Sequence, residues 1–237
     1  YYVSKFFTSF TLSVIFFLFL SCDNESTKAP SPAKLNAPGA QNSETAANPN
    51  DPHANFVGHQ ACAECHKTEH EEWLGSDHKN AMAPATEKSV LGNFDNQSLE
   101  INGITHRFYR AKNGDFMVEA DSEKGEMTSY KVEYVLGYEP LQQYMVRLPG
   151  NRIQCLHTAW NTTKKEWYHL YKDENPPAGD WLHWTGQGMT WNSQCADCHT
   201  TNTQINYDRT SNSFNTNYSE GNVSCEACHG PGKNHVN

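Results

Sequence analysis

The spacing of apolar and polar positions divides the chain into zones. Residues 6–20 form an apolar run broken only by Thr and Ser, and Lys5 precedes it. The run is too short for a typical membrane span, so residues 1–22 are predicted to be an export signal. Residues 23–52 are rich in Pro, Ala, Ser, Asn and Thr, with almost no large apolar side chains. They predict a flexible tether over 23–55, ahead of a folded domain over 56–237.

Residues 98–172 carry the pattern of a β-rich meander. Asn102-Gly103 and Asn113-Gly114 each lie between short runs of β-type residues, which is the strongest local signal for a hairpin. Pro149-Gly150-Asn151 marks a further turn. The predicted strands are 99–101, 105–111, 116–120, 130–136, 142–148, 152–160 and 166–171.

The zones on either side of this insertion predict loops and short helices. A short helix is expected at the segment that begins at Cys62, and residues 200–222 read as a polar loop rich in Asn, Thr and Ser. The predicted fold class is therefore α+β, with a β meander inserted between helical and loop segments.

Six of the eight cysteines fall in three copies of the pentad C-x-x-C-H. Motif 1 is residues 62–66, motif 2 is 195–199 and motif 3 is 225–229. The pentad is the attachment signature of c-type haem, in which two thiols add to the porphyrin vinyl groups and the histidine ligates the iron. At least three covalent haems c are therefore predicted. The attaching residues are Cys62, Cys65, Cys195, Cys198, Cys225 and Cys228, and the proximal iron ligands are His66, His199 and His229.

Two other uses of the cysteines were weighed against haem attachment. A disulfide framework would not need a histidine after each pair. Zinc is the stronger rival, but three Cys₂His sites do not divide evenly into Cys₄ or Cys₂His₂ cages. Cys155 lies outside the motifs and is predicted to be a small buried hydrophobe.

Composition supports haem attachment and excludes one class of partner. The hydrophobic fraction is 37% over 237 residues, which is low for a protein core of this length. Attached porphyrins would supply the missing apolar bulk, as other staples do in core-poor chains. The formal charge of −9 argues against nucleic acid as a partner and is compatible with a basic redox protein.

Several histidines are candidates for the sixth iron ligand. His78, shortly after motif 1, is the first candidate, with Met82 a weaker one; a surface histidine beside a helix cap is the alternative. His183 lies between two tryptophans, and it could ligate iron or pack on a porphyrin face. Three more histidines in the insertion are expected to be core residues rather than ligands: His106, His157 and His169.

The end of the apolar run suggests the cellular compartment. Leu20-Ser21-Cys22 resembles a bacterial lipoprotein cleavage site, although Phe19 stands where an aliphatic residue is usual. Lipidation of Cys22 would tether the protein to a membrane face, whereas an ordinary signal peptide is the alternative. Either signal predicts a periplasmic or cell-surface protein, the compartment in which haem c is attached.

The segments around the motifs resemble a known family. They include Tyr134 to Tyr144 (YVLGYEPLQQY), Trp167 to Tyr171 (WYHLY), His183 to Gly186 (HWTG) and Val223 to Gly232 (VSCEACHGPG). Together these are similar to the extracytoplasmic multihaem cytochromes with a cytochrome c-554-type domain, many of which carry tetratricopeptide repeats. The resemblance covers about residues 56–237. It implies haems with mostly bis-histidine iron, with His78 and His235 as the distal ligands, and a chain that continues beyond residue 237.

Two functions from different classes follow. Bis-histidine haems have no open iron position, so the first is an electron carrier that exchanges electrons with redox partner proteins. The alternative is an oxidoreductase that acts on a small nitrogen or sulfur oxyanion. That enzyme needs a five-coordinate iron and nearby acid–base groups, and the sequence shows no compact constellation of that kind.

Overall fold

The computed structural model describes residues 51–174 and 176–237. The predicted export signal, and the predicted tether up to residue 50, lie outside the described residues. The last residues before the folded domain are held by it: the His53 ring nitrogens lie 2.8 Å from Ser219 Oγ and 2.8 Å from Asn217 Oδ1. Within the described ranges, no helix is both long enough and apolar enough to cross a membrane.

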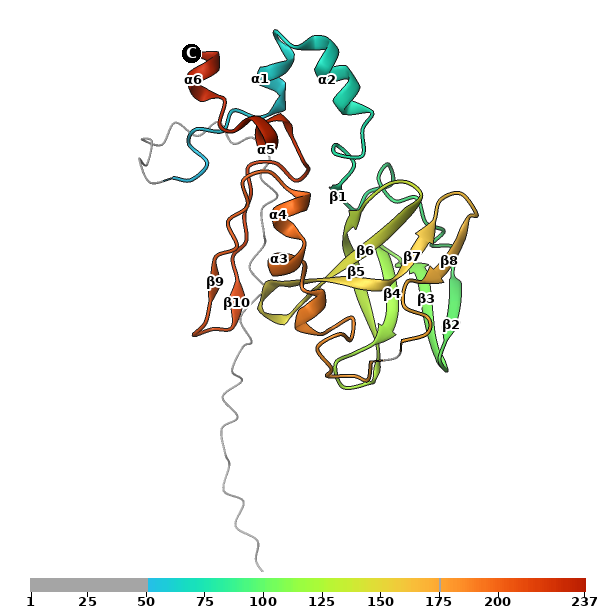
Figure 1. Ribbon diagram of the computed structural model, residues 1–237. Coiled ribbons are helices and arrows are strands. Elements are labelled where there is room, and N and C mark those ends of the chain that lie inside the picture. The colour runs from blue at the N-terminus through green and yellow to red at the C-terminus, as the bar shows by residue number, and fades with distance from the viewer. Residues whose placement is uncertain (1–50, 175) are drawn as a thin grey trace, which may run out of the picture. The chain divides into compact units, whose positions relative to one another are not determined.

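An antiparallel meander forms the largest part of the described fold (Figure 1). Seven strands follow one another in sequence order across it, and the short strand β1 (Met82–Pro84) pairs with β5 on the side. The first and last strands of this path contact each other, so the sheet curls into a barrel-like shape. The seven strands are β2 (Gln97–Ile101), β3 (Ile104–Arg110), β4 (Phe116–Asp121), β5 (Met127–Leu136), β6 (Leu141–Leu148), β7 (Arg152–Asn161) and β8 (Glu166–His169).

All seven predicted strands are confirmed, to within a few residues at their ends. Asn102 and Gly103 both have positive φ angles, 53° and 79°, which a two-residue hairpin turn requires. Asn151 and Gly150 adopt positive φ in the turn between β6 and β7, where the short helix η1 (Pro149–Asn151) lies. The turns could be predicted because only a few residue types adopt this backbone conformation without strain.

The barrel interior is packed with aromatic rings around Phe94. Its ring centroid lies 5.0 Å from Phe116, 5.2 Å from Tyr144 and 5.3 Å from Trp167. Trp167 in turn stacks flat on Phe108, and both are buried. Aromatic side chains of the insertion, Tyr144 and Trp167 among them, therefore form a protein core.

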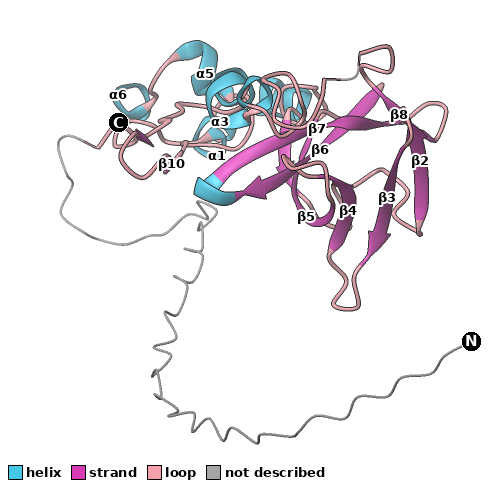
Figure 2. Ribbon diagram, turned by 90° about the horizontal axis from the view of Figure 1, so that it is seen from below, coloured by secondary structure: helices cyan, strands magenta, loops and turns pink. Residues whose placement is uncertain are grey.

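Short helices and loops make up the rest of the described chain. In Figure 2 most of the helices lie together on one side of the sheet. A hairpin of β9 (Tyr207–Asp208) and β10 (Ser213–Phe214) occupies the stretch predicted as a polar loop. The helices are α1 (His59–Ala63), α2 (Lys67–Leu74), η2 (Gln187–Met189), α3 (Trp191–Gln194), α4 (Ala196–His199), α5 (Cys225–His229) and α6 (Lys233–Val236).

A second apolar cluster fastens the helices of motif 2 to the sheet. It contains Met145 and Ile153 from the strands, and Trp191 and Ala196 from α3 and α4. The Ile153 backbone N–H donates to Asn192 Oδ1 at 2.8 Å, and Gln154 forms an antiparallel bridge with Thr190. Helix α3, which directly precedes motif 2, therefore packs on β7.

Candidate functional site

Each C-x-x-C-H motif forms about one turn of helix. The His66 backbone N–H donates to the Cys62 carbonyl at 2.9 Å, and that of His199 donates to the Cys195 carbonyl at 3.1 Å. Motif 3 coincides with α5. Residues three and four positions apart in a helix share a face, so the thiols and the imidazole of each motif point the same way.

The two cysteines of each motif differ in exposure. The second cysteine is exposed in every motif: Cys65, Cys198 and Cys228. The first cysteine is partly buried: Cys62, Cys195 and Cys225. A porphyrin bound through both sulfurs would therefore rest on the protein at one edge and cover exposed surface at the other.

Motifs 1 and 3 lie side by side, although most of the chain separates them. Burial, followed by the nearby Cys225 thiol, raises the pKa of Cys62. Helices α1 and α5 are in contact, as Figure 1 shows. The Trp73 Nε1–H donates to the Val223 carbonyl at 2.8 Å, which ties the end of α2 to the segment before motif 3.

Glu226, inside motif 3, holds three segments together. Its side chain is 4% exposed. One oxygen lies 2.9 Å from the Val57 backbone nitrogen and 2.7 Å from that of Gly232, and the other lies 2.8 Å from that of Gly58. A Cβ on Gly232 would lie 2.9 Å from Val57 Cγ2, so this approach leaves no room for a side chain. The carboxylate thus connects motif 3 to the residues before motif 1 and to the start of α6.

Thr201 links motif 2 to motif 3. It is fully buried, two residues after His199. Its hydroxyl donates to the Asn222 carbonyl at 2.8 Å and accepts the Ser224 backbone N–H at 2.9 Å, one residue before motif 3 begins. Together with the contact between α1 and α5, this brings the three motifs into one region of the described fold.

The hydrogen bond of the His199 ring suits iron ligation. His199 Nδ1 lies 3.2 Å from the Ala81 carbonyl oxygen. Because a carbonyl can only accept, Nδ1 carries the proton and Nε2 keeps its lone pair. Metal-bound histidines are oriented in this way, so the residues of motif 2 fit the haem that the sequence predicts.

His78 lies in the segment that passes between motifs 2 and 3. Its carbonyl accepts the Val223 backbone N–H at 3.1 Å, and its side chain is exposed. The Ala81 carbonyl that binds His199 is three residues further on. The segment that carries His78 therefore lies beside both motifs, and iron ligation by His78 stays a prediction. His229 of motif 3 is also exposed.

His235 faces His66 of motif 1. Their ring centroids are 6.3 Å apart, and the ring planes differ by 29°. A metal–nitrogen bond of about 2 Å on each side would put two imidazoles on opposite sides of one metal at roughly this separation. The ring separation is compatible with two ligands of one iron, and ligation by His235 stays a prediction.

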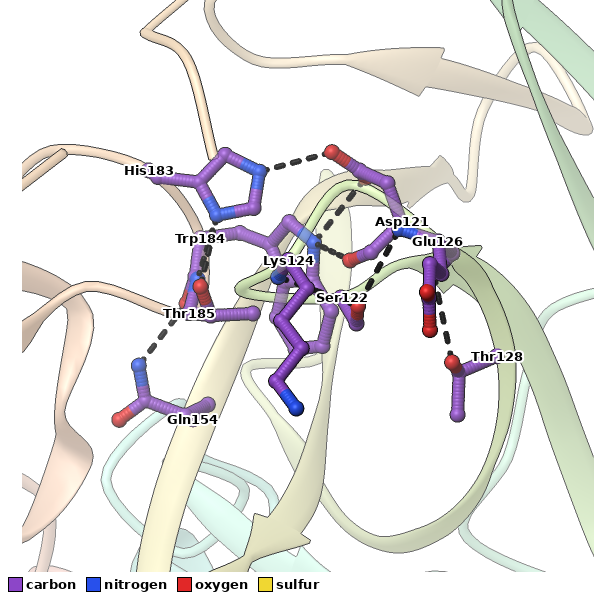
Figure 3. Close-up of polar contacts among 9 residues, drawn as sticks. All are labelled: Asp121, Ser122, Lys124, Glu126, Thr128, Gln154, His183, Trp184 and Thr185. Atoms are coloured by element: carbon purple, nitrogen blue, oxygen red, sulfur yellow. Dashed lines mark hydrogen bonds and ion pairs between the residues drawn. The ribbon is translucent and has the colours of Figure 1, made fainter. Parts of the chain in front are cut away.

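His183 lies in a different environment (Figure 3). It is buried, with Nε2 2.8 Å from Asp121 Oδ2 and Nδ1 2.7 Å from Thr185 Oγ1. Although burial alone would raise the pKa of Asp121, the hydrogen bond and charge of His183 hold it below its usual range. Ligation by His183 would require one of these two contacts to break, so its role as a ligand stays a prediction.

Three further histidines surround this pair inside the barrel. The His169 ring centroid lies 6.4 Å from that of His106 and 5.5 Å from that of His157. His106 Nδ1 and His157 Nε2 are buried without a hydrogen-bond partner. Burial, followed by the positive potential of His169 and His183, lowers the pKa of His157 to about 4. Within residues 51–174 and 176–237, no group of three or more His, Cys, Asp or Glu side chains is placed to bind a metal ion.

Some residues of the site gave no signal in the sequence. Glu226 is one. Cys155 is buried, as predicted, and the sequence did not indicate that it shares an apolar cluster with Cys195. His59 and His70 also pair beside motif 1, with Nδ1 and Nε2 2.8 Å apart.

Comparisons with known proteins agree with the motifs. The family described as "Cytochrome c554 and c-prime" matches residues 61–107 and 154–230, just over half of the chain. Among solved structures, the outer cell wall cytochrome OcwA matches 77% of the chain with 22% identity and a TM-score of 0.48. That match covers 33% of OcwA, so the chain spans about a third of its length. No curated protein sequence matches the chain. The family match shows that the chain belongs to the cytochrome c554 and c-prime family and is a multihaem c-type cytochrome domain.

Proposed function

We propose that this chain is an extracytoplasmic electron-transfer module that carries electrons through at least three covalently attached haems. The observation that carries the proposal is the convergence of three C-x-x-C-H motifs in one region. Helix α1, which contains Cys62, contacts α5, which is motif 3, and Thr201 joins motif 2 to motif 3. When bound, each haem supplies an iron that cycles by one electron.

The residues of the chain would attach, orient and insulate these groups. The cysteine pairs fix each porphyrin, and His66, His199 and His229 bind iron from the proximal side. The hydrogen bond from His199 Nδ1 to Ala81 orients that ring. Because α1 and α5 contact each other, porphyrins on motifs 1 and 3 would lie close enough for electrons to pass between them without a bound substrate.

We propose further that His66 and His235 ligate the same iron. Replacing His235 with alanine is expected to convert one haem from low-spin to high-spin, because its sixth ligand is lost. Electron paramagnetic resonance of the ferric protein would measure this change. Asn234→Ala, an exposed neighbour in α6, is the matched control and should leave the spectrum unchanged. A spectrum of His235→Ala that matches the wild type would rule out this pairing.

His78 is proposed as the sixth ligand of the haem on motif 2 or motif 3. His78→Ala is expected to produce one high-spin haem, and His78→Ala with His235→Ala should produce two. Asp77→Ala, at the exposed position before it, serves as the control. If the His78→Ala protein stays fully low-spin, the assignment of His78 is wrong.

Binding of cyanide or nitrite to the ferric haems distinguishes an electron carrier from an oxidoreductase. The carrier predicts ferric haems that are all low-spin and inert to cyanide and nitrite. A haem that is high-spin in the wild-type protein and binds either anion would favour the oxidoreductase acting on a small nitrogen or sulfur oxyanion.

The proposed setting is the periplasm or the cell surface, with a lipid on Cys22 as the tether. The cleavage-site pattern before Cys22 and the requirement of haem c for extracytoplasmic attachment support this setting. The formal charge of −9 suits redox partner proteins with a basic docking face. Labelling with a radioactive fatty acid tests the tether, since Cys22→Ser should abolish incorporation.

A further inference from the structure

Residues 222–224, just before motif 3, form a junction that is bound by segments of the other two motifs. The hydroxyl of Thr201, two residues after motif 2, bonds to the first and the last residue of this junction, at 2.8 and 2.9 Å. Val223, the middle residue, donates its backbone N–H to the His78 carbonyl at 3.1 Å. The groups that bind the junction therefore set where motif 3 begins.

Trp73, near the end of α2, binds the remaining backbone group of Val223. Its Nε1–H donates to the Val223 carbonyl at 2.8 Å. Together with the bond to His78, this uses both the N–H and the C=O of Val223. The middle of the junction is thus fixed entirely by the segment that follows motif 1.

Two histidine rings and a lysine surround the indole of Trp73. The ring centroid of His59 in α1 lies 4.6 Å from that of Trp73, and the centroid of His70 in α2 lies 5.6 Å away. His59 Nδ1 and His70 Nε2 form a hydrogen bond of 2.8 Å. The Lys79 ammonium nitrogen lies 5.8 Å from the indole centroid. Neighbours from α1, α2 and the loop after α2 therefore hold the indole in its orientation toward the junction.

The same aromatic stack is also bound to the residues just before the junction. The His59 backbone N–H donates to Glu220 Oε2 at 3.2 Å, and His59 Nε2 lies 3.6 Å from Glu220 Oε1. The Glu220 carbonyl accepts the Thr201 backbone N–H at 2.9 Å. Helices α1 and α2 thus bind the approach to motif 3 at two points, Glu220 and Val223.

We propose that Trp73 is a positioning residue for motif 3. Its indole N–H fixes the junction against the segment that carries His78, so that Cys225 and His229 keep a defined position beside that segment. The inference rests on haem attachment at motif 3, proposed above. Phenylalanine keeps an aromatic ring for the stack but has no donor for the Val223 carbonyl, so Trp73→Phe separates positioning from packing.

Amide hydrogen exchange measures the positioning directly. In the haem-loaded full chain, Trp73→Phe should raise the exchange rates of the Val223 and Ser224 amides about tenfold, the factor that corresponds to a hydrogen bond of ordinary strength. Mass spectrometry of short overlapping peptides across the junction gives these rates. Trp181→Phe, which replaces a tryptophan that is 56% exposed, is the matched control and should leave them unchanged. Unchanged exchange in Trp73→Phe would overturn the proposal.

A second variant covers the case in which Trp73→Phe does not fold. His59→Leu keeps the indole N–H but removes one of the rings that orient it. This variant should raise the same exchange rates by a smaller factor. Exchange rates in His59→Leu equal to those of the wild type would then overturn the proposal.

Paramagnetic resonance of the ferric protein separates positioning from a loss of packing. Trp73→Phe should change the g values of one haem and leave the other signals as in the wild type, because the hydrogen bond joins motif 3 to the His78 segment alone. A spectrum identical to that of the wild type would mean that Trp73 only packs, and would overturn the proposal. If no haem is found on motif 3, the proposed function fails there, whereas exchange in the haem-free chain still decides whether Trp73 fixes the junction.

Discussion

Replacing Glu226 with glutamine is expected to lower the free energy of unfolding by about 3–5 kcal/mol, since charge-assisted hydrogen bonds contribute roughly 1.5–3 kcal/mol each. The Glu226 carboxylate is buried and accepts backbone N–H groups of Val57, Gly58 and Gly232. A glutamine side chain has one acceptor oxygen, and its NH₂ group would face N–H donors. At least one of those donors would be left buried without a partner.

The same change should disturb the haem on motif 1. Gly232 begins the turn that carries His235, and Val57 and Gly58 lead into α1. Releasing both segments should raise the high-spin fraction of one ferric haem. Urea unfolding followed by circular dichroism gives the stability, and paramagnetic resonance gives the spin state.

Glu64→Gln is the control for this prediction. Glu64 occupies an x position of motif 1, as Glu226 does in motif 3, but it is exposed. Its replacement should change stability by less than about 0.5 kcal/mol. Equal unfolding free energies for Glu226→Gln and Glu64→Gln would show that the hydrogen bonds of Glu226 to Val57, Gly58 and Gly232 do not stabilise the fold.

Acidification from pH 7 to pH 4 is expected to destabilise the barrel by about 3 kcal/mol through His157 alone, at about 1.36 kcal/mol per unit of pKa difference. The pKa of His157 is lowered to about 4 in the folded protein, against a usual value of 6.5. Between these values the unfolded chain binds a proton that the folded chain does not. Stability therefore falls as the pH drops through this window.

Three neighbouring side chains, His106, His169 and Asp121, also make the folded protein less stable as the pH falls. The pKa values of His106 and His169 are also lowered, mainly by burial. The pKa of Asp121 is lowered too, so its stabilisation is present above its usual pKa and is lost as the pH falls through its folded value. His183, whose Nε2 lies 2.8 Å from Asp121 Oδ2, is the remaining titratable group beside these side chains.

Urea unfolding at pH 7.0, 5.5 and 4.5 measures this dependence. His157→Leu should flatten the slope, because the group that takes up the proton on unfolding is gone, while His53→Leu, outside the barrel, should leave the slope unchanged. A wild-type protein equally stable at pH 7.0 and 4.5 would show that the barrel histidines are not held neutral by burial.

Local features of the chain could be predicted from the sequence. The strands follow from alternating side chains and from Asn-Gly turns whose backbone angles few residues adopt. The motifs follow from their own spacing. Residues 200–222 were expected to be a loop, because the strands β9 and β10 are only two residues long and leave no periodic pattern.

Contacts between distant segments could not be predicted. Glu64 and Glu226 look alike in sequence, and only the fold buries one of them among backbone N–H groups. Cys155 and Cys195 share one apolar cluster because α3 packs on β7, which no spacing rule reveals. For His183 the sequence left ligation and packing on a porphyrin equally open, and it gave no sign that Asp121 and Thr185 bind both ring nitrogens.

Each of the three motifs of this chain is expected to attach one haem covalently. The most direct test is the intact mass of the protein produced with haem-maturation proteins, measured under denaturing conditions after acid–acetone extraction. Covalent attachment at all three motifs should increase the mass by three haems, with one haem found on the peptide of each motif. A protein that loses its haem on extraction, or that carries zinc at these cysteines instead, would contradict it.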